Sequence, residues 1–124
     1  MADLTLAQRF GDNVAFDETT KILSIDLNDL ASIIVSGVDV GLDVTGMTAI
    51  NQDNYSSKVL WALLQKSNAS QPTDNNDETV GVYITNQGKV NSVRNSVSQF
   101  GYRLLATAYQ NDQDGIILDP DNIA

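Results

Sequence analysis

The sequence predicts an α+β fold: a mainly antiparallel sheet of about five or six strands packed on one central helix at about 55–67, with one or two short helices. Short stretches of alternating apolar and polar residues recur between turn residues, as in half-buried strands. The chain has fourteen Asp and twelve Asn but two Glu, and Asp and Asn favour turns and caps over helix interiors. One stretch alone is apolar enough for a buried helix.

The N-terminal segment predicts a short helical turn. Thr5-Leu6-Ala7-Gln8 has the form of a capping box, in which the Thr and Gln side chains each satisfy a free amide of the first turn. Gly11 follows as a helix stop. Leu6 and Phe10 lie four residues apart, so we expect both to pack on the body of the protein.

A hairpin with one buried face is expected next. Val14 and Phe16 alternate with polar or small residues, 17–20 reads as a turn, and apolar residues alternate again over 23–27. Leu30, Ile33 and Ile34 then have helical spacing, with Gly37 placed to end a two-turn helix.

The β-branched run 33–35 also allows a strand at this place. Strict alternation over 38–45 predicts a half-buried strand with an acidic outer face, and Gly41 is expected to mark a bulge within it.

The central helix is predicted to begin after Asp53 or Asn54, since either side chain can cap the first turn. Apolar residues cover nearly all of its circumference, which indicates a buried helix. We therefore expect Leu60, Trp61 and Leu64 to be largely buried.

The rest of the chain reads as a polar loop over 68–78, a strand over 80–85 and a hairpin turn at 86–88. Two readings compete for the next segment, because apolar residues from Val90 to Leu104 have helical spacing but lie among poor helix formers. We favour strands at about 89–94 and 100–110. A last short strand is expected at 115–119, and we expect residues 1–124 to form a single domain.

Composition excludes several kinds of chemistry. The chain has no Cys and no His, which removes thiolate nucleophiles, the commonest general base and the commonest transition-metal ligand. A net charge of −9 disfavours nucleic acid and anionic membranes as partners. We expect no enzymatic activity and no cofactor. No secretion signal is recognisable, so we expect a cytoplasmic protein or one assembled into a particle.

One turn has some features of a calcium loop. Asp112 and Asp114 fall on ligand positions of an EF-hand loop, and Gly115 falls on its sharp turn. Gln110 replaces the first ligand, however, and Pro120 leaves no room for a second helix. Asp112 and Asp114 are therefore the candidate metal ligands, but a tight turn is the favoured interpretation.

Two further groups of residues have both a functional and a structural interpretation. Asp39 and Asp43 with Asp26 or Asp29 could supply the oxygen ligands of a cation site, but a solvated strand face is the favoured interpretation. A second group could form a small recognition patch, although arginines on a sheet more often pair with an Asp; its members are Arg94, Tyr102, Arg103 and Tyr109.

The favoured function is a non-enzymatic structural or assembly subunit that acts through protein–protein contacts, as a homo-oligomer or with other subunits. The abundance of Asn, Asp, Ser, Thr and Val resembles small structural subunits of virions and phages. Residues 1–53 carry a net charge of −7, residues 54–111 of +2 and residues 112–124 of −4. Turn-rich ends are the favoured explanation of this asymmetry, and the alternative is an acidic surface on one copy that faces a less acidic one on its neighbour. The contact is expected at Leu4, Leu6 and Phe10 and at Ile116–Leu118. The alternative is a small binding module for a ligand, metal or carbohydrate that uses the 68–78 loop and the acidic turns.

Overall fold

The computed structural model describes residues 3–110 and 120–123, and it confirms the α+β class. Six strands form three separate two-stranded antiparallel sheets, and the main helix is α2. The chain divides into two compact units: an N-terminal unit, Leu4–Thr73, and a C-terminal unit, which comprises Asp3 and the described residues from Asp74 onward. The helices and strands are α1 (Leu6–Phe10), β1 (Ala15–Asp17), β2 (Ile22–Ser24), η1 (Leu27–Leu30), β3 (Ile34–Val35), β4 (Val38–Asp39), η2 (Gln52–Tyr55), α2 (Ser56–Ser70), β5 (Val82–Arg94), β6 (Val97–Ala108) and η3 (Pro120–Asn122).

Helix α1 confirms the predicted capping box. The Gln8 backbone amide donates to Thr5 Oγ1 over 3.1 Å, and the Thr5 amide donates to Gln8 Oε1 over 2.8 Å. Gly11 ends the helix with a φ of 110°, which a residue with a side chain rarely adopts. The local sequence therefore determines both ends of this helix.

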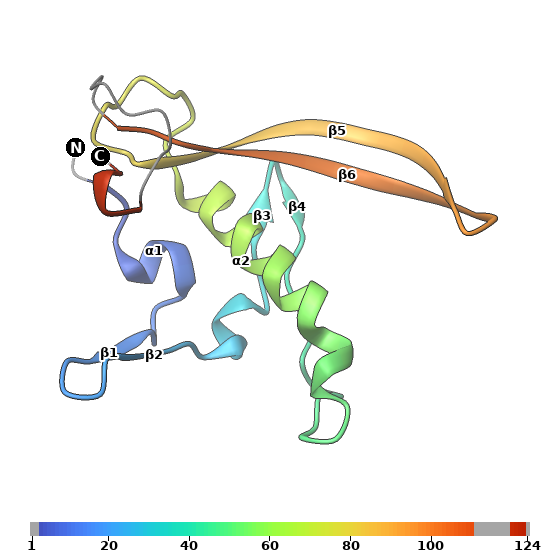
Figure 1. Cartoon of the computed structure of the whole chain (residues 1–124), viewed down its shortest axis with the longest axis horizontal. Helices are drawn as coiled ribbons and strands as arrows, with labels where there is room; N and C mark the ends of the chain where they lie inside the picture. Colours follow the sequence, from blue (N-terminus) through green and yellow to red (C-terminus); the bar gives the residue numbers. More distant parts are fainter. Residues whose placement is uncertain (1–2, 111–119, 124) are drawn as a thin grey trace. The chain divides into compact units, whose positions relative to one another are not determined.

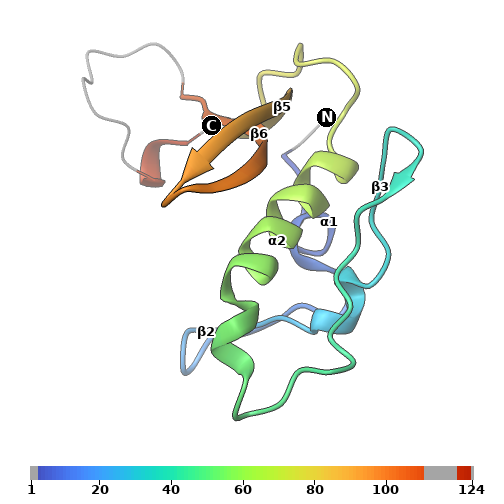
Figure 2. The ribbon, with the colours of Figure 1, turned by 90° about the vertical axis from the view of Figure 1, so that its right-hand side faces the viewer.

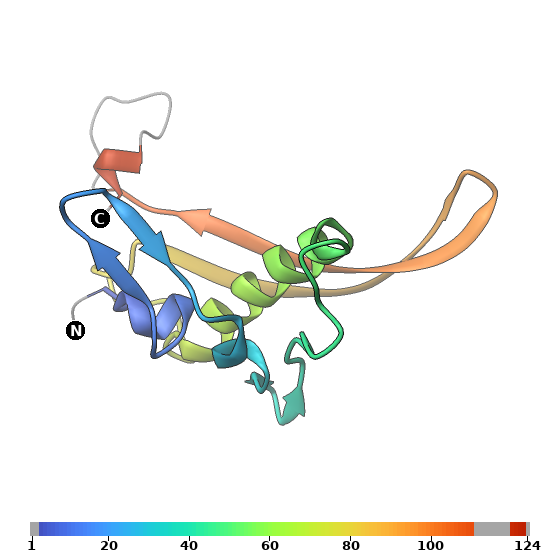
Figure 3. The same ribbon diagram turned by 90° about the horizontal axis from the view of Figure 1, so that it is seen from below.

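Strands β1 and β2 form the predicted hairpin (Figure 3), and the register pairs Phe16 with Leu23. The expected buried face is wrong, because every residue of both strands is exposed. Each strand has only three residues, and their sheet has no third strand. The alternation in the sequence therefore corresponds to a two-stranded hairpin whose apolar side chains remain exposed to solvent.

The helix predicted before Gly37 is wrong. A single 3-10 turn, η1, begins after Asp26, whose Oδ1 accepts from the Asn28 amide over 3.0 Å. The β-branched run then forms β3, and Ser36 and Gly37 make the tight turn to β4 with φ of 52° and 78°. Two successive positive φ values are typical of a hairpin turn, so Gly37 reverses the chain and does not end a helix.

The strand predicted over 38–45 is wrong in its length, since β4 ends at Asp39. The chain then crosses back over η1, where the Leu42 amide donates to the Leu30 carbonyl over 2.8 Å. A Cβ added at Gly41 would lie 2.1 Å from the Ala31 carbonyl oxygen. Gly41 is therefore required by a close backbone approach, and no bulge in a longer strand is present.

Helix α2 packs on α1, η1 and β3 within the N-terminal unit (Figure 2). It is preceded by the 3-10 turn η2, and no side chain caps its first turn, so the expected Asp53 or Asn54 cap is wrong. Its buried residue in the core is Ala62, which lies with Leu30, Ile33 and Leu42 from the preceding segment, and Val59 and Leu63 of α2 pack against this cluster.

The expected burial along α2 is wrong for Leu60, whose side chain is 63% exposed, while Trp61 and Leu64 are half-buried. A helix that contacts partners along one side buries a stripe and leaves the remainder in solvent, whatever its composition.

Strands β5 and β6 form one long hairpin, Val82–Ala108, which we call the β5–β6 ribbon (Figure 1). The strand interpretation of this segment is confirmed over the helical one. The turn predicted at 86–88 is wrong: Gly88, with a φ of 85°, lies at a register shift within β5. The chain reverses at Asn95 and Ser96, whose φ values are 50° and 62°. The last predicted strand, 115–119, lies outside the described residues.

Candidate interaction surface

The cross-strand register of the β5–β6 ribbon assigns its side chains to two faces. Lys89 pairs with Tyr102 and Asn91 with Phe100, and directly opposed residues share a face. We call this the aromatic face, which also carries Val93. The alternate positions form the arginine face, and its members include Val90, Arg94, Val97, Gly101, Arg103 and Leu105.

Large apolar side chains are exposed on both faces. Val93 and Phe100 on the aromatic face are 71% and 67% exposed, and Val97 on the arginine face is 54% exposed. The sheet of β5 and β6 has two strands, so each strand has an outer edge without a neighbouring strand among the described residues. Open edges and exposed apolar side chains together favour association with another chain.

The ribbon is also cationic. No acid occurs between Thr79 and Gln110, whereas Lys89, Arg94 and Arg103 are all present. Lys89 Nζ lies 4.6 Å from the centre of the Phe100 ring, and Arg94 Nε donates to Gln99 Oε1 over 2.7 Å. In the described part of the chain, no carboxylate pairs with either arginine.

The structure divides the residues that were considered as a recognition patch. Arg94 and Arg103 share one face, whereas Tyr102 lies on the other. Tyr109 follows the end of β6, where its hydroxyl accepts from Asn75 Nδ2 over 2.7 Å. The alternative expectation, that an Asp pairs with these arginines, is also wrong for the described residues.

A hollow lies on the arginine face where Gly101 leaves a gap between larger neighbours. Its volume is about 420 Å³, and its lining includes Val90, Arg94, Gln99 and Arg103. A Cβ at Gly101 would only reach 3.4 Å from Val90 Cγ2, so the strand itself does not require Gly here. A glycine inside a strand is a sequence signal for close approach by another group, and sequence reasoning missed it at Gly101.

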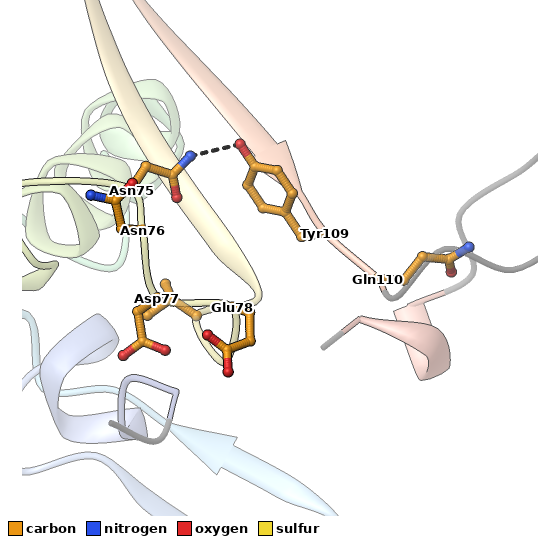
Figure 4. Close-up of a pocket in the computed structure, with 7 residues that line it drawn as sticks. Asn75, Asn76, Asp77, Glu78, Tyr109 and Gln110 are labelled. Carbon is orange, nitrogen blue, oxygen red and sulfur yellow. Dashed lines mark hydrogen bonds between the residues drawn. The ribbon is translucent and has the colours of Figure 1, made fainter.

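A second hollow, in the C-terminal unit, contains part of the loop expected to bind a ligand (Figure 4). Its volume is about 230 Å³, below the roughly 300–1,000 Å³ typical of small-molecule sites. Asn75 reaches toward Tyr109, and Asp77 Oδ1 accepts from the Thr79 hydroxyl and amide over 2.6 and 2.9 Å. These contacts stabilise the loop, while Gln110 Oε1 in the lining has no hydrogen-bond partner among the described residues.

The acidic residues considered as a cation site are held separately. Hydrogen bonds from the Gly41 amide, and then from the Ile33 amide, lower the pKa of Asp39 below its ordinary value. The hydroxyl and amide of Thr45 lower the pKa of Asp43 in the same way. No group of three or more potential ligands is placed for a metal within residues 3–110 and 120–123.

Other predicted residues lie inside the fold or outside the described part. Leu4 is buried, Leu6 is exposed and Phe10 is half-buried, so only Leu6 of the expected N-terminal contact is fully available. Asp112 and Asp114, together with Ile116–Leu118, lie outside the described residues. No helix in the described ranges is long and apolar enough to cross a membrane.

Comparison with protein-family models, curated proteins and solved structures finds no match to this chain.

Proposed function

We propose that this protein is a non-enzymatic structural or assembly subunit, of virion or phage origin, that forms a homo-oligomer through the β5–β6 ribbon. The observation that supports this function is the ribbon itself, with thirteen residues in β5 and twelve in β6. A two-stranded hairpin is marginally stable in water unless it packs on another surface. A ribbon of this length with exposed apolar residues on both faces therefore suits a contact with a second copy.

The energetics favour association despite the net charge of −9. Burial of one large apolar side chain contributes about 1.5–3 kcal/mol. Repulsion between exposed charges is largely screened beyond about 10 Å at 0.1 M salt. Burial of Val93, Val97 and Phe100 therefore outweighs repulsion between distant acids, provided that the interface approaches the roughly 1,200 Å² of a specific complex.

Light scattering after size exclusion tests this function on the full chain over a range of concentrations. We expect an oligomer whose mass falls on dilution. Phe100→Thr and Val97→Thr should each weaken association, because Thr retains the strand preference but removes most of the apolar area. Ile50→Thr is the matched control, since Ile50 is 98% exposed and lies outside the ribbon. A monomeric wild-type chain at every concentration would refute the proposal.

A further inference from the structure

We propose that the Gly101 hollow of one copy receives the β1–β2 turn of a second copy, with the Glu18 carboxylate between Arg94 and Arg103. This inference rests on the proposed assembly function and names the two surfaces that meet. The hollow supplies space, two cationic side chains flank it, and the turn supplies an exposed acid.

The shape of the hollow suits a narrow polar turn. Gly101 presents no side chain, and its neighbours on the arginine face rise on either side of it. Arg94 is already oriented by its hydrogen bond to Gln99, which reduces the entropy lost when a carboxylate binds. Guanidinium groups also match the planar geometry of a carboxylate better than an ammonium does. The site therefore favours an acidic side chain from a protruding segment.

Charge decides against contact between two ribbons. Each ribbon carries three cations and no acid, so pairing ribbon with ribbon would bring like charges together. Like charges across an interface cost several kcal/mol. The N-terminal unit, in contrast, carries eight acids and four bases between Leu4 and Thr73. A second copy therefore offers a complementary surface on that unit.

Most acids of the N-terminal unit already serve local structure. Asp29 accepts from Asn13, Asp26 caps η1, and Asp39 and Asp43 accept from nearby amides. Glu18 differs: it is exposed in the turn between β1 and β2, and none of the described residues donates a hydrogen bond to it. Its carboxylate is thus available to another chain.

Hydrogen bonds within the turn that carries Glu18 stabilise its backbone. Asp17 Oδ1 accepts from the amides of Thr19 and Thr20 over 2.9 and 3.0 Å. Lys21 has its ammonium group directed at the Phe16 ring, 5.9 Å from the ring centre. Phe16 and Ile22 are exposed beside the turn, so docking would bury apolar area around the ion pair. The turn therefore combines an available acid, a hydrogen-bonded backbone and neighbouring apolar side chains, all of which suit the hollow.

A charge exchange between copies tests this contact in the full-length protein. Arg103→Glu and Glu18→Arg should each weaken self-association about tenfold or more, because each places like charges together. Combining both substitutions in one chain should restore association to within about threefold of wild type, since the pair is re-formed with reversed sign. Lys58→Glu is the matched control: it makes the same charge change on an exposed residue of α2, outside the ribbon, and should have the smaller effect.

Protection from proteolysis gives a second measurement on the unaltered chain. Glu18 and Glu78 are the two glutamates of the sequence, and both are exposed. A glutamate-specific protease should therefore cut both sites in dilute monomer, but should cut at Glu78 several-fold faster than at Glu18 in the oligomer. Equal protection of both sites would contradict the assignment.

The outcomes separate this inference from the assembly function. An oligomeric wild type that is insensitive to Arg103→Glu, or that the double exchange does not restore, overturns the Glu18 contact and leaves assembly intact. A wild type that is monomeric throughout refutes the assembly function first. Tight binding of a single-stranded oligonucleotide that is lost in Arg103→Glu would also overturn the inference, because it would assign the hollow to nucleic acid.

Discussion

Leu30 and Leu60 have the same side chain but opposite environments. Leu30 is fully buried at 0% exposure, in a 3-10 turn that the sequence did not indicate, whereas Leu60 lies on the solvent side of α2. The central helix was predicted correctly from its apolar content, but its buried stripe depends on partners that are distant in sequence. Composition therefore located the helix and did not identify the residues that form the core.

Substitution of these two leucines should separate core from surface. Leu30→Ala should lower the free energy of unfolding by about 2–5 kcal/mol, because it leaves a cavity against Ile33, Leu42 and Ala62. Leu60→Ala should change it by only about 0.5 kcal/mol. Urea denaturation followed by Trp61 fluorescence measures both. Equal effects would contradict the core described for the N-terminal unit.

Asp39 should contribute to stability in a pH-dependent way. Its pKa in the folded protein lies below the ordinary value of 3.8, because the Gly41 and Ile33 amides donate to the carboxylate. A lowered folded pKa stabilises the protein above the unfolded value, and this contribution is lost as pH falls through the folded pKa. Asp39→Asn should therefore reduce the melting temperature at pH 7 and reduce its fall below about pH 4.

Melting curves between pH 7 and pH 2.5 test the Asp39 prediction. Asp12→Asn is the matched control, because Asp12 is exposed and the described residues donate no hydrogen bond to it. An Asp39→Asn profile parallel to wild type across the whole range would show that the carboxylate does not act through these amides.

At the scale of elements, hairpin turns explain both the successes and the failures of prediction. The sequence predicted β1–β2 and the strand character of 89–110 because alternation is a local property. It misplaced the ribbon turn because Gly88 was the obvious candidate for positive φ. In the structure the chain reverses at Asn95 and Ser96, and Gly88 lies at a register shift within β5. Turn position depends on cross-strand register, which single-strand patterns do not report.

Ser96 is the weak position of that turn. It adopts a φ of 62°, which costs a residue with a side chain about 1–2 kcal/mol relative to glycine. Ser96→Gly should therefore stabilise the ribbon and slow amide hydrogen exchange near its turn by about threefold or more. Ser98→Gly, two residues further into β6, should accelerate exchange, because glycine weakens a regular strand. Faster exchange in Ser96→Gly would contradict the assigned turn.

At the scale of the whole molecule, the uneven distribution of charge could be predicted from the sequence, whereas the position of the candidate contact site could not. The cationic middle and acidic flanks are visible without a fold. That the middle cations lie on a two-stranded ribbon, with two arginines beside Gly101, required the β5–β6 register. The cation site that was considered at Asp39 and Asp43 is not formed in the described residues, because each of these carboxylates accepts hydrogen bonds from nearby backbone amides.

Salt should weaken self-association if the ribbon docks on an acidic turn. Raising ionic strength from about 0.05 to 0.5 M shortens the Debye length several-fold and screens the attraction between Glu18 and the arginines. We expect the apparent dissociation constant to rise about tenfold, measured by sedimentation velocity. Stronger association at high salt would indicate that apolar burial alone drives assembly.

The acceptor hollow and the acidic turn lie on different elements of one chain, so each copy carries two unlike contact surfaces. Two copies that exchange both contacts close as a pair, whereas a single contact leaves one hollow and one turn open on the docked pair. Growth then continues until the rotation between neighbours closes a ring, or it proceeds without limit as a fibre. A chain with Arg103→Glu keeps the acidic turn but no longer has a hollow that binds an acid. Added in small amounts, it should dock through its turn and then offer no binding surface to the next copy, so growth stops there. The length of the assembly would then be set by the ratio of the two chains.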